Sequence, residues 1–435
     1  MSPSKIKLEQ ALVAAGLAIV TLGLAALARR TKKKEEFEPY DLRLGLTKKK
    51  HKKIKWGFMG AGRVAHDFAN ALKVVEGAEL HCVAVSSGLE RSENFAKLHG
   101  FIKAYGSYEE ALKDKEVDII YLSAMHSSRV EHVTKILNAG KHALVEKPIA
   151  ITSDDAKQFF ALAKKKNLFL MEGMWTRFFP AVEKARQFMD DGIIGPITAV
   201  ISDFGFDAGD SGAYPKDISN VRDGDPIYHS SLGGGALLWA GPYPIAAGLL
   251  PFKTEAPQRI AASGVSDSVT NVELSCAIGL NFKTPGGTAP SATCTDNMLN
   301  KRIGCPARGA CVSLFTAIDS ESTETTTYIG PSGRIVVETP SHCPTHLSLH
   351  LKSQGRGSIS STHFHFPLPS LPSNAVTNAD NNYFYYPNSM GFAYEAAAVS
   401  RIIAAGLTEC PQYTAEECLN TMNIISRSRE LVLQH

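Results

Sequence analysis

A glycine-rich turn constrains the fold of this 435-residue chain more than any other feature. Residues 54–59 form a short apolar stretch that predicts a strand, and the stretch after the turn has apolar residues at helical spacing. The turn between them carries the pattern G-x-G-x-x-A at Gly60, Gly62 and Ala65. The first glycine permits a tight turn, the second lets a pyrophosphate approach the backbone, and the alanine lets helix and strand pack closely. The pattern therefore predicts a dinucleotide site at the start of a helix.

The next 90 residues repeat the alternation of strand and helix. Apolar strands are predicted at 80–85, 117–122 and 142–145, and helices are predicted to begin near Ser107 and Val130. Strands that alternate with helices indicate a parallel sheet that is covered on both faces. We therefore expect an α/β protein whose N-terminal half is a Rossmann parallel sheet.

The second half of the chain shows a different pattern. Short β-rich stretches, separated by turn residues, lie at 197–204, 258–262, 311–316, 334–338 and 346–351. They predict an α+β domain with an open, mainly antiparallel sheet. Residues 283–308 resemble an insertion because they are rich in turn-forming residues. The expected organisation is an anchor and basic linker over 1–53, a Rossmann domain over 54–172 and a C-terminal substrate and dimerisation domain over 173–435.

An apolar run precedes the predicted domains. Ala11 to Ala28 spans 18 residues, with Thr21 as the single polar side chain. This length is near the minimum for a membrane-spanning helix, which needs ~17–25 residues. Five basic residues follow within 29–34, so the positive-inside rule places the rest of the chain in the cytosol. We expect a membrane anchor over 11–28. Because Ala26 to Ala28 resembles a cleavage site, a secretory or organelle-targeting peptide is the alternative.

Charge and cysteine content exclude several classes of protein. Residues 1–55 hold 14 Lys and Arg against five Asp and Glu, whereas the remainder holds 32 against 38. The predicted domains are therefore slightly acidic, which argues against nucleic-acid binding. The eight cysteines form no C-x-x-C pair, which argues against a zinc ribbon and against a disulfide scaffold. We find no pattern of metal ligands and expect no metal.

The residues after the second predicted strand indicate which dinucleotide binds. An NAD site usually has an acid there, which holds the 2′-hydroxyl of the ribose. Here the strand is followed by Ser87 and then Arg91, and the first carboxylate is Glu90. A hydroxyl and a guanidinium suit a 2′-phosphate, so we expect NADP. The alternative is that Arg91 only caps a solvated helix.

Several longer motifs resemble the glucose–fructose oxidoreductase/inositol dehydrogenase superfamily. They are G-x-x-G-A-G-R-V-A at 57–65, G-K-H-A-L-V-E-K-P at 140–148, M-E-G-M-W-T-R-F-F-P at 171–180, L-G-G-G-A-L-L at 232–238 and P-N-S-M-G-F-A-Y-E-A at 387–396. Within this superfamily the chain is most similar to the dimeric dihydrodiol dehydrogenases, also described as NADP-dependent D-xylose dehydrogenases. The resemblance implies an NADP-dependent oxidoreductase that oxidises a hydroxyl of a sugar, polyol or trans-dihydrodiol. It also implies a homodimer formed through the C-terminal sheet.

The resemblance further implies a hydride-transfer site. Lys147 matches the lysine that hydrogen-bonds the reacting hydroxyl, and Tyr243 matches a tyrosine general base. Such a tyrosine works at neutral pH only if a nearby cation favours its phenolate, which Lys147 would supply. The residues expected to bind the cofactor are Gly60, Gly62, Arg63, Val64, Ser87, Arg91, His126, Glu146, Lys147, Trp175 and Arg177. The residues expected to line the substrate pocket are Trp175, Phe178 and Trp239.

Two departures from the family pattern leave alternatives open. Trp239 stands where relatives carry an aspartate that positions the base or binds a substrate hydroxyl. Residues 124–126 read Ala-Met-His in place of the usual Thr-Pro-His. The alternative function is a membrane-tethered NADP(H)-binding sensor or scaffold without turnover. The structural alternatives are that Tyr243 and Trp175 are core residues and that His126 serves packing.

Overall fold

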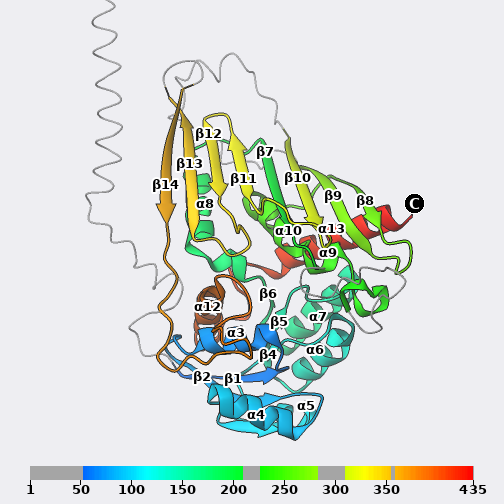
Figure 1. Cartoon of the computed structure of the whole chain (residues 1–435), viewed down its shortest axis with the longest axis vertical. Coiled ribbons are helices and arrows are strands. Elements are labelled where there is room, and N and C mark those ends of the chain that lie inside the picture. Colours follow the sequence, from blue (N-terminus) through cyan, green and yellow to red (C-terminus); the bar gives the residue numbers. More distant parts are fainter. Residues whose placement is uncertain (1–51, 209–225, 283–308, 354–357, 435) are drawn as a thin grey trace, which may run out of the picture. The chain divides into compact units, whose positions relative to one another are not determined.

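The computed structural model describes residues 52–208, 226–282, 309–353 and 358–434 (Figure 1). These residues form two sheets with helices packed against them. The apolar run at 11–28 and the predicted insertion at 283–308 lie outside the described residues.

The first sheet has six parallel strands in the order β3-β2-β1-β4-β5-β6, which confirms the expected Rossmann arrangement. Its strands are β1 (Ile54–Met59), β2 (Ala78–Ala84), β3 (Lys103–Tyr105), β4 (Ile119–Leu122), β5 (His142–Glu146) and β6 (Leu170–Gly173). Its helices are α3 (Arg63–Leu72), α4 (Leu89–His99), α5 (Tyr108–Lys113), α6 (Arg129–Asn138) and α7 (Ser153–Lys166). All four residues of β4 are buried, as expected for a strand covered on both faces. The strand order reverses between β1 and β4, and ligands bind at such a point, beyond the carboxyl ends of the strands.

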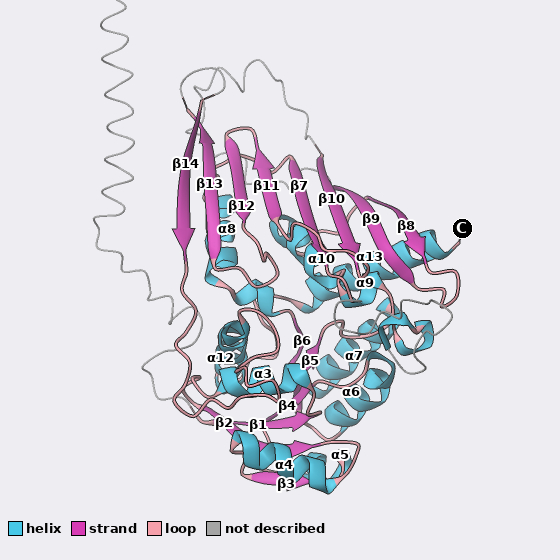
Figure 2. Cartoon of the chain, in the orientation of Figure 1, coloured by secondary structure: helices cyan, strands magenta, loops and turns pink. Residues whose placement is uncertain are grey.

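The second sheet has eight strands in the order β14-β13-β12-β11-β7-β10-β9-β8 (Figure 2). Neighbouring strands are antiparallel except for β7 and β10, which are parallel, so the predicted open, mainly antiparallel sheet is confirmed. The strands are β7 (Ala199–Gly205), β8 (Arg259–Ser266), β9 (Glu273–Phe282), β10 (Ala310–Ala317), β11 (Thr326–Gly330), β12 (Gly333–Val337), β13 (His346–Lys352) and β14 (Ile359–His365).

Helices cover one face of the second sheet and leave the other face open. The covering helices are α8 (Pro180–Asp190), α9 (Ala236–Trp239), α10 (Pro242–Leu249) and α13 (Ala415–Leu433). Side chains along β10 alternate accordingly: Val312 and Leu314 are buried beneath the helices, whereas Cys311 and Phe315 are exposed. This alternation is typical of an antiparallel sheet with one solvated face.

The C-terminal part of the chain returns to the first sheet. Helix α12 (Phe392–Ala404) packs against α3 and β1. The indole Nε1 of Trp56 in β1 donates to Ser400 Oγ in α12 over 3.2 Å, and Trp56 is fully buried. A helix of the predicted C-terminal domain therefore completes the covering of the N-terminal sheet.

The segment before α12 is held against α3 by a buried carboxylate. Asp67 in α3 accepts hydrogen bonds from the backbone N–H of Tyr385 (2.9 Å), the backbone N–H of Tyr386 (3.0 Å) and the hydroxyl of Ser389 (2.7 Å). Asn70, one turn further along α3, bonds the backbone of the same segment. Burial raises the pKa of Asp67 to about 6, against the lowering effect of its donors.

The structure corrects the predicted membrane anchor. Across residues 52–208, 226–282, 309–353 and 358–434, no helix is both long and apolar enough to cross a bilayer. The longest helix of these ranges, α13, carries charged side chains along its length, and charges are costly in a bilayer core. The predicted membrane-anchored localisation is therefore withdrawn.

Replacing Asp67 by alanine should destabilise the protein strongly. The change leaves three donors without their acceptor, so we expect the free energy of unfolding to fall by about 2–4 kcal/mol. Urea unfolding measures this loss. The control is Asp154→Ala in α7, whose side chain is 81% exposed, and it should cost less than about 0.5 kcal/mol. Equal effects of the two changes would show that Asp67 does not hold the segment.

Candidate active site

The glycine turn between β1 and α3 has the geometry of a phosphate site. Gly60 has φ +117°, and a Cβ there would lie 2.5 Å from Ser123 Oγ, so no other residue fits. Gly62 is the N-cap of α3, and no described atom lies within 4 Å of the place its Cβ would take. The first turn of α3 carries no acid. Its free backbone N–H groups therefore face open space, where a phosphate can accept hydrogen bonds from them.

Two arginines flank this turn. Arg91 lies in α4, and its Nη2 atom is 3.4 Å from the carbonyl oxygen of Ala61. Ser87 is exposed just before α4 begins. Arg63 is exposed at the start of α3, and its guanidinium carbon lies 5.6 Å from the ring centroid of Tyr385. The predicted cofactor-binding residues Gly60, Gly62, Arg63, Val64, Ser87 and Arg91 thus lie together around the glycine turn.

Lys147 follows β5 directly and links the two halves of the structure. Its Nζ donates to the backbone carbonyl of Trp239, at the end of α9, over 2.6 Å. The same Nζ lies 4.7 Å from the ring centroid of Tyr243. Burial lowers the pKa of Lys147 to about 8, although Glu146 favours the charged form. A lysine with this pKa exchanges its proton readily near neutral pH.

Tyr243 lies in the first turn of α10, surrounded by aromatic rings. Its ring centroid lies 5.1 Å from that of Phe204 and 5.2 Å from that of His342. Burial, followed by the charge of Glu146, raises the pKa of Tyr243 well above its ordinary value. The expected lowering of this pKa by Lys147 is therefore not found, because the ammonium lies over the ring face in a site dominated by desolvation.

His126 and Trp239 meet at one backbone carbonyl. The Nδ1 atom of His126 lies 2.9 Å from the oxygen of Gly233, and the Nε1 of Trp239 donates to the same oxygen over 3.1 Å. Their ring centroids lie 4.9 Å apart. Burial lowers the pKa of His126 well below its ordinary value, so the imidazole is neutral and its Nδ1–H donates. His126 therefore connects the end of β4 to the glycine-rich turn before α9.

A layer of buried charge lies beneath Lys147. Glu146 accepts a hydrogen bond from the hydroxyl of Tyr121 over 2.6 Å, and burial raises the pKa of this carboxyl. The buried guanidinium of Arg129 has its pKa lowered to about 10 by burial, while Glu146 and Glu172 favour its charged form. Acid and base are thus held close together where water is excluded, which strengthens each electrostatic interaction.

Comparison with known proteins assigns this arrangement to a family. A family model described as "Oxidoreductase family, NAD-binding Rossmann fold" matches residues 54–174. The trans-1,2-dihydrobenzene-1,2-diol dehydrogenase of Sus scrofa is 31% identical over 381 residues, which cover 87% of this chain and 97% of that protein. The chain belongs to this oxidoreductase family. The enzyme of the same name from Danio rerio is 30% identical over 380 residues, with the same coverage of each chain.

Solved structures of other oxidoreductases share the fold. The 3-ketoreductase KijD10 of Actinomadura kijaniata, in complex with NADP and TDP-benzene, aligns with a TM-score of 0.65 at 21% identity, over 87% of this chain and 98% of that chain. A levoglucosan dehydrogenase in complex with NADH and levoglucosan aligns with a TM-score of 0.67 at 16% identity, over 87% and 97%. Because the relatives that are about 30% identical are named dehydrogenases, the comparisons lend no support to the sensor without turnover.

Arg177 does not join the other predicted cofactor residues of this oxidoreductase. Its Nη1 lies 2.8 Å from Glu417 Oε1, its Nη2 donates to the carbonyl of Ala246 over 2.7 Å, and its side chain is 1% exposed. Trp175, two residues earlier, stacks on Phe392 at 4.1 Å and lies close enough to Tyr243 to lower its pKa slightly. Both residues lie in one 3₁₀ turn, where residues two apart point in widely different directions.

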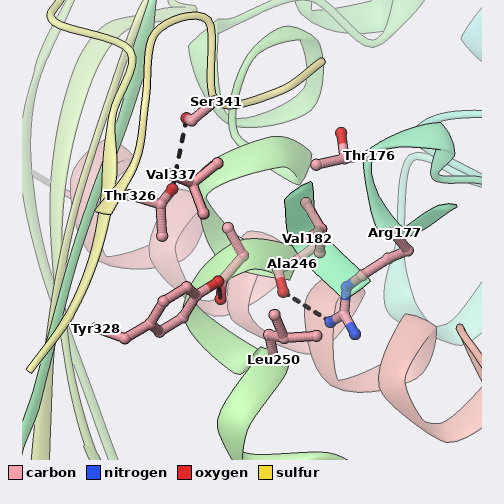
Figure 3. A pocket seen from close by; sticks show the side chains of 10 residues that line it. Thr176, Arg177, Val182, Ala246, Leu250, Thr326, Tyr328, Val337 and Ser341 are labelled. Carbon is pink, nitrogen blue, oxygen red and sulfur yellow. Dashed lines mark hydrogen bonds between the residues drawn. The ribbon is translucent and has the colours of Figure 1, made fainter. Parts of the chain in front are cut away.

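Arg177 lines a small cavity instead (Figure 3). The cavity lies between α10 and the second sheet and has room for about one water molecule. It is lined by Thr176, Arg177, Val182, Ala246, Ala247, Leu250, Thr326, Tyr328, Val337 and Ser341. Phe178, the residue after Arg177, is also fully buried. The side-chain bonds of Arg177 go to Glu417 and Ala246, and the roles of Arg177 in cofactor binding and of Phe178 in the substrate pocket stay predictions.

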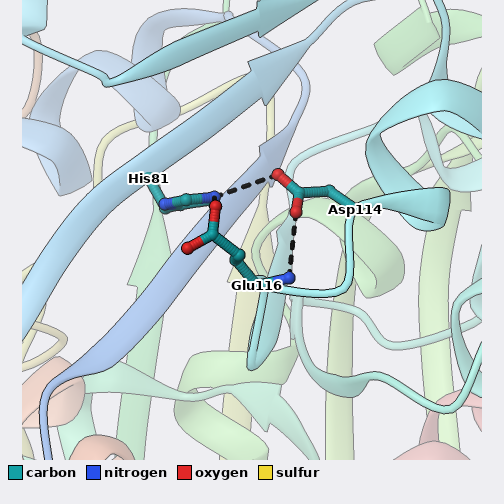
Figure 4. A group of neighbouring side chains, drawn as sticks. All are labelled: His81, Asp114 and Glu116. Carbon is teal, nitrogen blue, oxygen red and sulfur yellow. Dashed lines mark hydrogen bonds and ion pairs between the residues drawn. The ribbon is translucent and has the colours of Figure 1, made fainter.

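Three potential metal ligands, His81, Asp114 and Glu116, also lie together in the first half of the described chain (Figure 4). His81 Nε2 lies 3.0 Å from Asp114 Oδ2 and 3.9 Å from Glu116 Oε2. The ammonium of Lys103 already pairs with both carboxylates, at 3.0 and 2.7 Å. Since lysine supplies the countercharge, we assign no metal to this cluster.

One further residue near the glycine turn, Tyr386, was not predicted from the sequence. Tyr386 is 45% exposed, and its pKa is raised by partial burial, lowered by Arg63 and raised by Glu146. Its hydroxyl therefore lies within electrostatic reach of both the glycine turn and the end of β5. No local pattern marks it, because its position depends on hydrogen bonds to Asp67 more than 300 residues earlier.

The two glycines should respond differently to alanine. Gly62→Ala has open space for its Cβ, so we expect an unchanged melting temperature and weaker dinucleotide binding, because the methyl group enters the space of the phosphates. Gly60→Ala should lower both the melting temperature and the affinity, because the positive φ and the contact with Ser123 strain the backbone. Thermal unfolding and calorimetric titration with NADP distinguish the two. Unchanged binding by Gly62→Ala would place the phosphates elsewhere.

Proposed function

We propose that the chain oxidises a hydroxyl group of a small sugar, polyol or trans-dihydrodiol with NADP as cofactor. The observation that carries this proposal is the placement of Lys147 and Tyr243 at the carboxyl end of the Rossmann sheet, next to an open glycine turn. The names of the relatives, trans-1,2-dihydrobenzene-1,2-diol dehydrogenases, support the reaction class. Because substrate loops vary within one fold, the particular alcohol follows from neither the fold nor these residues.

Lys147 is the proton acceptor in this proposal. Oxidation of an alcohol removes a hydride from carbon and a proton from oxygen, and NADP, when bound, supplies the hydride acceptor. Neutral Lys147 takes the hydroxyl proton and becomes an ammonium, which its bond to the carbonyl of Trp239 stabilises. Its pKa of about 8 suits this task, since proton transfer is most efficient when the pKa lies near the working pH. Tyr243, whose pKa is raised, keeps its proton and donates a hydrogen bond that orients the substrate oxygen.

Arg91 selects NADP over NAD in this proposal. Its guanidinium lies at the glycine turn, close to Ala61, and Ser87 offers a hydroxyl at the end of β2. Between Ser87 and Arg91 the sequence has one carboxylate, Glu90, and its side chain is exposed at the start of α4. A guanidinium forms strong hydrogen bonds with phosphate, so this site favours a 2′-phosphate.

The chain also forms a homodimer in this proposal, through the open face of the second sheet. The apolar side chains Ile201 and Phe315 are 52% and 37% exposed there, on neighbouring strands. Exposed apolar groups on a sheet face favour association with a second copy.

Arg91→Ala should weaken NADP binding by about 1.5–3 kcal/mol, which is the contribution of a hydrogen bond to a charged group. NAD binding should change little, because NAD lacks the 2′-phosphate. The control is Lys97→Ala, which removes an exposed cation from the last turn of the same helix. Calorimetric titration of each variant with both dinucleotides provides the measurement. If Arg91→Ala weakens NADP and NAD equally, the arginine does not read the 2′-phosphate.

The oxidation rate should depend on pH through Lys147. Because its pKa is lowered to about 8, the neutral form becomes more abundant as pH rises, and kcat/KM should rise up to about pH 8 and then level off. Lys147→Met should lower kcat by ~10²–10⁴-fold with little change in NADP affinity. Tyr243→Phe should reduce the rate and keep the midpoint near 8.

Lys73→Met is the matched control for this profile. Burial also lowers the pKa of Lys73 to about 8, but its Nζ bonds Asn374 and lies outside the candidate site. This variant should keep the pH profile of the unaltered protein. A midpoint that disappears in Tyr243→Phe would instead identify the tyrosine as the base, and NADP binding without turnover of any alcohol would exclude the proposed reaction.

A further inference from the structure

The short helix α9 determines where Lys147 points. Trp239, the last residue of α9, provides the carbonyl that accepts the hydrogen bond from Lys147 Nζ. Tyr243 follows four residues later, in the first turn of α10. A helix of four residues has little stability of its own, because helix nucleation is unfavourable. The position of α9 must therefore be fixed by other parts of the structure.

A buried carboxylate lies at the N-terminus of this helix. Glu273, the first residue of β9, is fully buried. The N-cap of α9 is Gly235, with φ +104°, and a Cβ there would lie only 2.6 Å from Glu273 Oε1 and 2.7 Å from Oε2. The carboxylate thus occupies the space that any other residue at position 235 would need. This contact explains why the third glycine of the motif L-G-G-G-A-L-L is required.

The carboxyl group of Glu273 lies beside a guanidinium and close to a backbone amide of α9. Arg429 in α13 places its Nε 3.2 Å from Glu273 Oε1. The backbone amide of Leu237, in the first turn of α9, also lowers the pKa of Glu273, although burial raises it overall. Carboxylates stabilise helix N-termini because free N–H groups and the helix dipole favour a negative charge there. Glu273 therefore places a carboxyl group beside the N-terminus of α9, whose N-cap glycine has no side chain of its own.

We propose that Glu273 and Arg429 form a positioning pair that holds α9 in place and thereby directs Lys147 toward the substrate. Neither residue is a catalytic residue in this view, because both act through the backbone of α9. The inference rests on the proposed function only in assuming that the position of Lys147 matters for catalysis. The contacts of Glu273 and Arg429 do not depend on the reaction.

Other contacts hold α9 at several points, so loss of the pair should displace the helix without unfolding it. Thr316 in β10 donates to the carbonyl of Ala236 over 3.3 Å. The carbonyl of Gly233, just before α9, accepts bonds from His126 and Trp239. None of these contacts replaces the charge at the helix N-terminus. We therefore expect a small shift of the Trp239 carbonyl when the pair is broken.

The test is Glu273→Gln, which keeps the size of the side chain and removes its charge. We expect kcat to fall by between about 10- and 100-fold, the scale of a small misplacement of reacting groups. The affinity for NADP should stay unchanged. The titration midpoint of Lys147 should rise from about 8 toward the ordinary lysine value, because a displaced α9 removes its acceptor and admits water. Competitive acetylation followed by mass spectrometry measures this midpoint without reference to turnover.

Glu417→Gln is the matched control, since Glu417 forms another buried ion pair from α13, with Arg177. This variant should lower the melting temperature about as much as Glu273→Gln while leaving the Lys147 midpoint unchanged. The double variant Glu273→Gln/Arg429→Gln removes the unpaired guanidinium, so stability should recover while the Lys147 midpoint stays raised.

The outcomes separate the two proposals. If Glu273→Gln lowers stability but leaves kcat and the Lys147 midpoint unchanged, the pair is structural and the inference is overturned. The same conclusion follows if the double variant restores the midpoint. If the titration midpoint of Lys147 moves as expected, but neither the unaltered protein nor any variant oxidises an alcohol, the positioning pair is supported and the proposed function is excluded.

Discussion

The hydrogen bond from Lys147 to the carbonyl of Trp239 joins the two halves of this structure at the candidate active site. An ammonium removed from water needs an acceptor, and here the Rossmann half supplies the ammonium while the second half supplies the acceptor. Partial loss of hydration lowers the pKa of the lysine to about 8. The bond therefore fixes the position of the ammonium, while its burial determines the pH range in which its proton can move.

Buried carboxylates recur where distant segments of the chain must meet. Asp67 binds the segment before α12, Glu146 binds Tyr121, Glu417 pairs with Arg177, and Glu273 lies at the start of α9. Each offers two acceptor atoms, so one side chain can hold several donors. The cost of burying such a group is offset only when its donors are in place, which favours one arrangement of the segments over looser ones.

The Rossmann half could be predicted from the sequence because its signals are local. The strand at 142–145 and the glycine turn at 60–65 each lie within a few residues. The structure confirms the four predicted strands of the first sheet to within two residues, whereas the short strands β3 and β6 were not predicted. Strands β9, β11 and β14 of the second sheet were also missed, because no clear local alternation of apolar and polar residues marks them. The open sheet was nevertheless expected correctly from its neighbouring strands.

The candidate site was less predictable, because its geometry depends on distant contacts. Trp175 and Arg177 lie two residues apart in one motif, yet in their 3₁₀ turn Trp175 stacks on Phe392 whereas Arg177 pairs with Glu417. The pKa of Tyr243 is raised where a lowered pKa was expected, since burial outweighs the neighbouring charge, and the roles that we propose for Lys147 and Tyr243 differ from the expected ones for this reason. A motif identifies which residues are neighbours in sequence, whereas desolvation and side-chain direction are set by the whole fold.

The return of α12 to the first sheet has a consequence for synthesis. Domains usually fold from the N-terminus as the chain leaves the ribosome. Here Trp56 and Phe68 are covered in part by α12, through Ser400 and through the ring of Phe392 at 5.5 Å. The nascent Rossmann half must therefore wait for more than 200 further residues before this apolar surface is covered. During that interval the surface is open to chaperones, and a truncated chain that ends after β6 keeps it exposed.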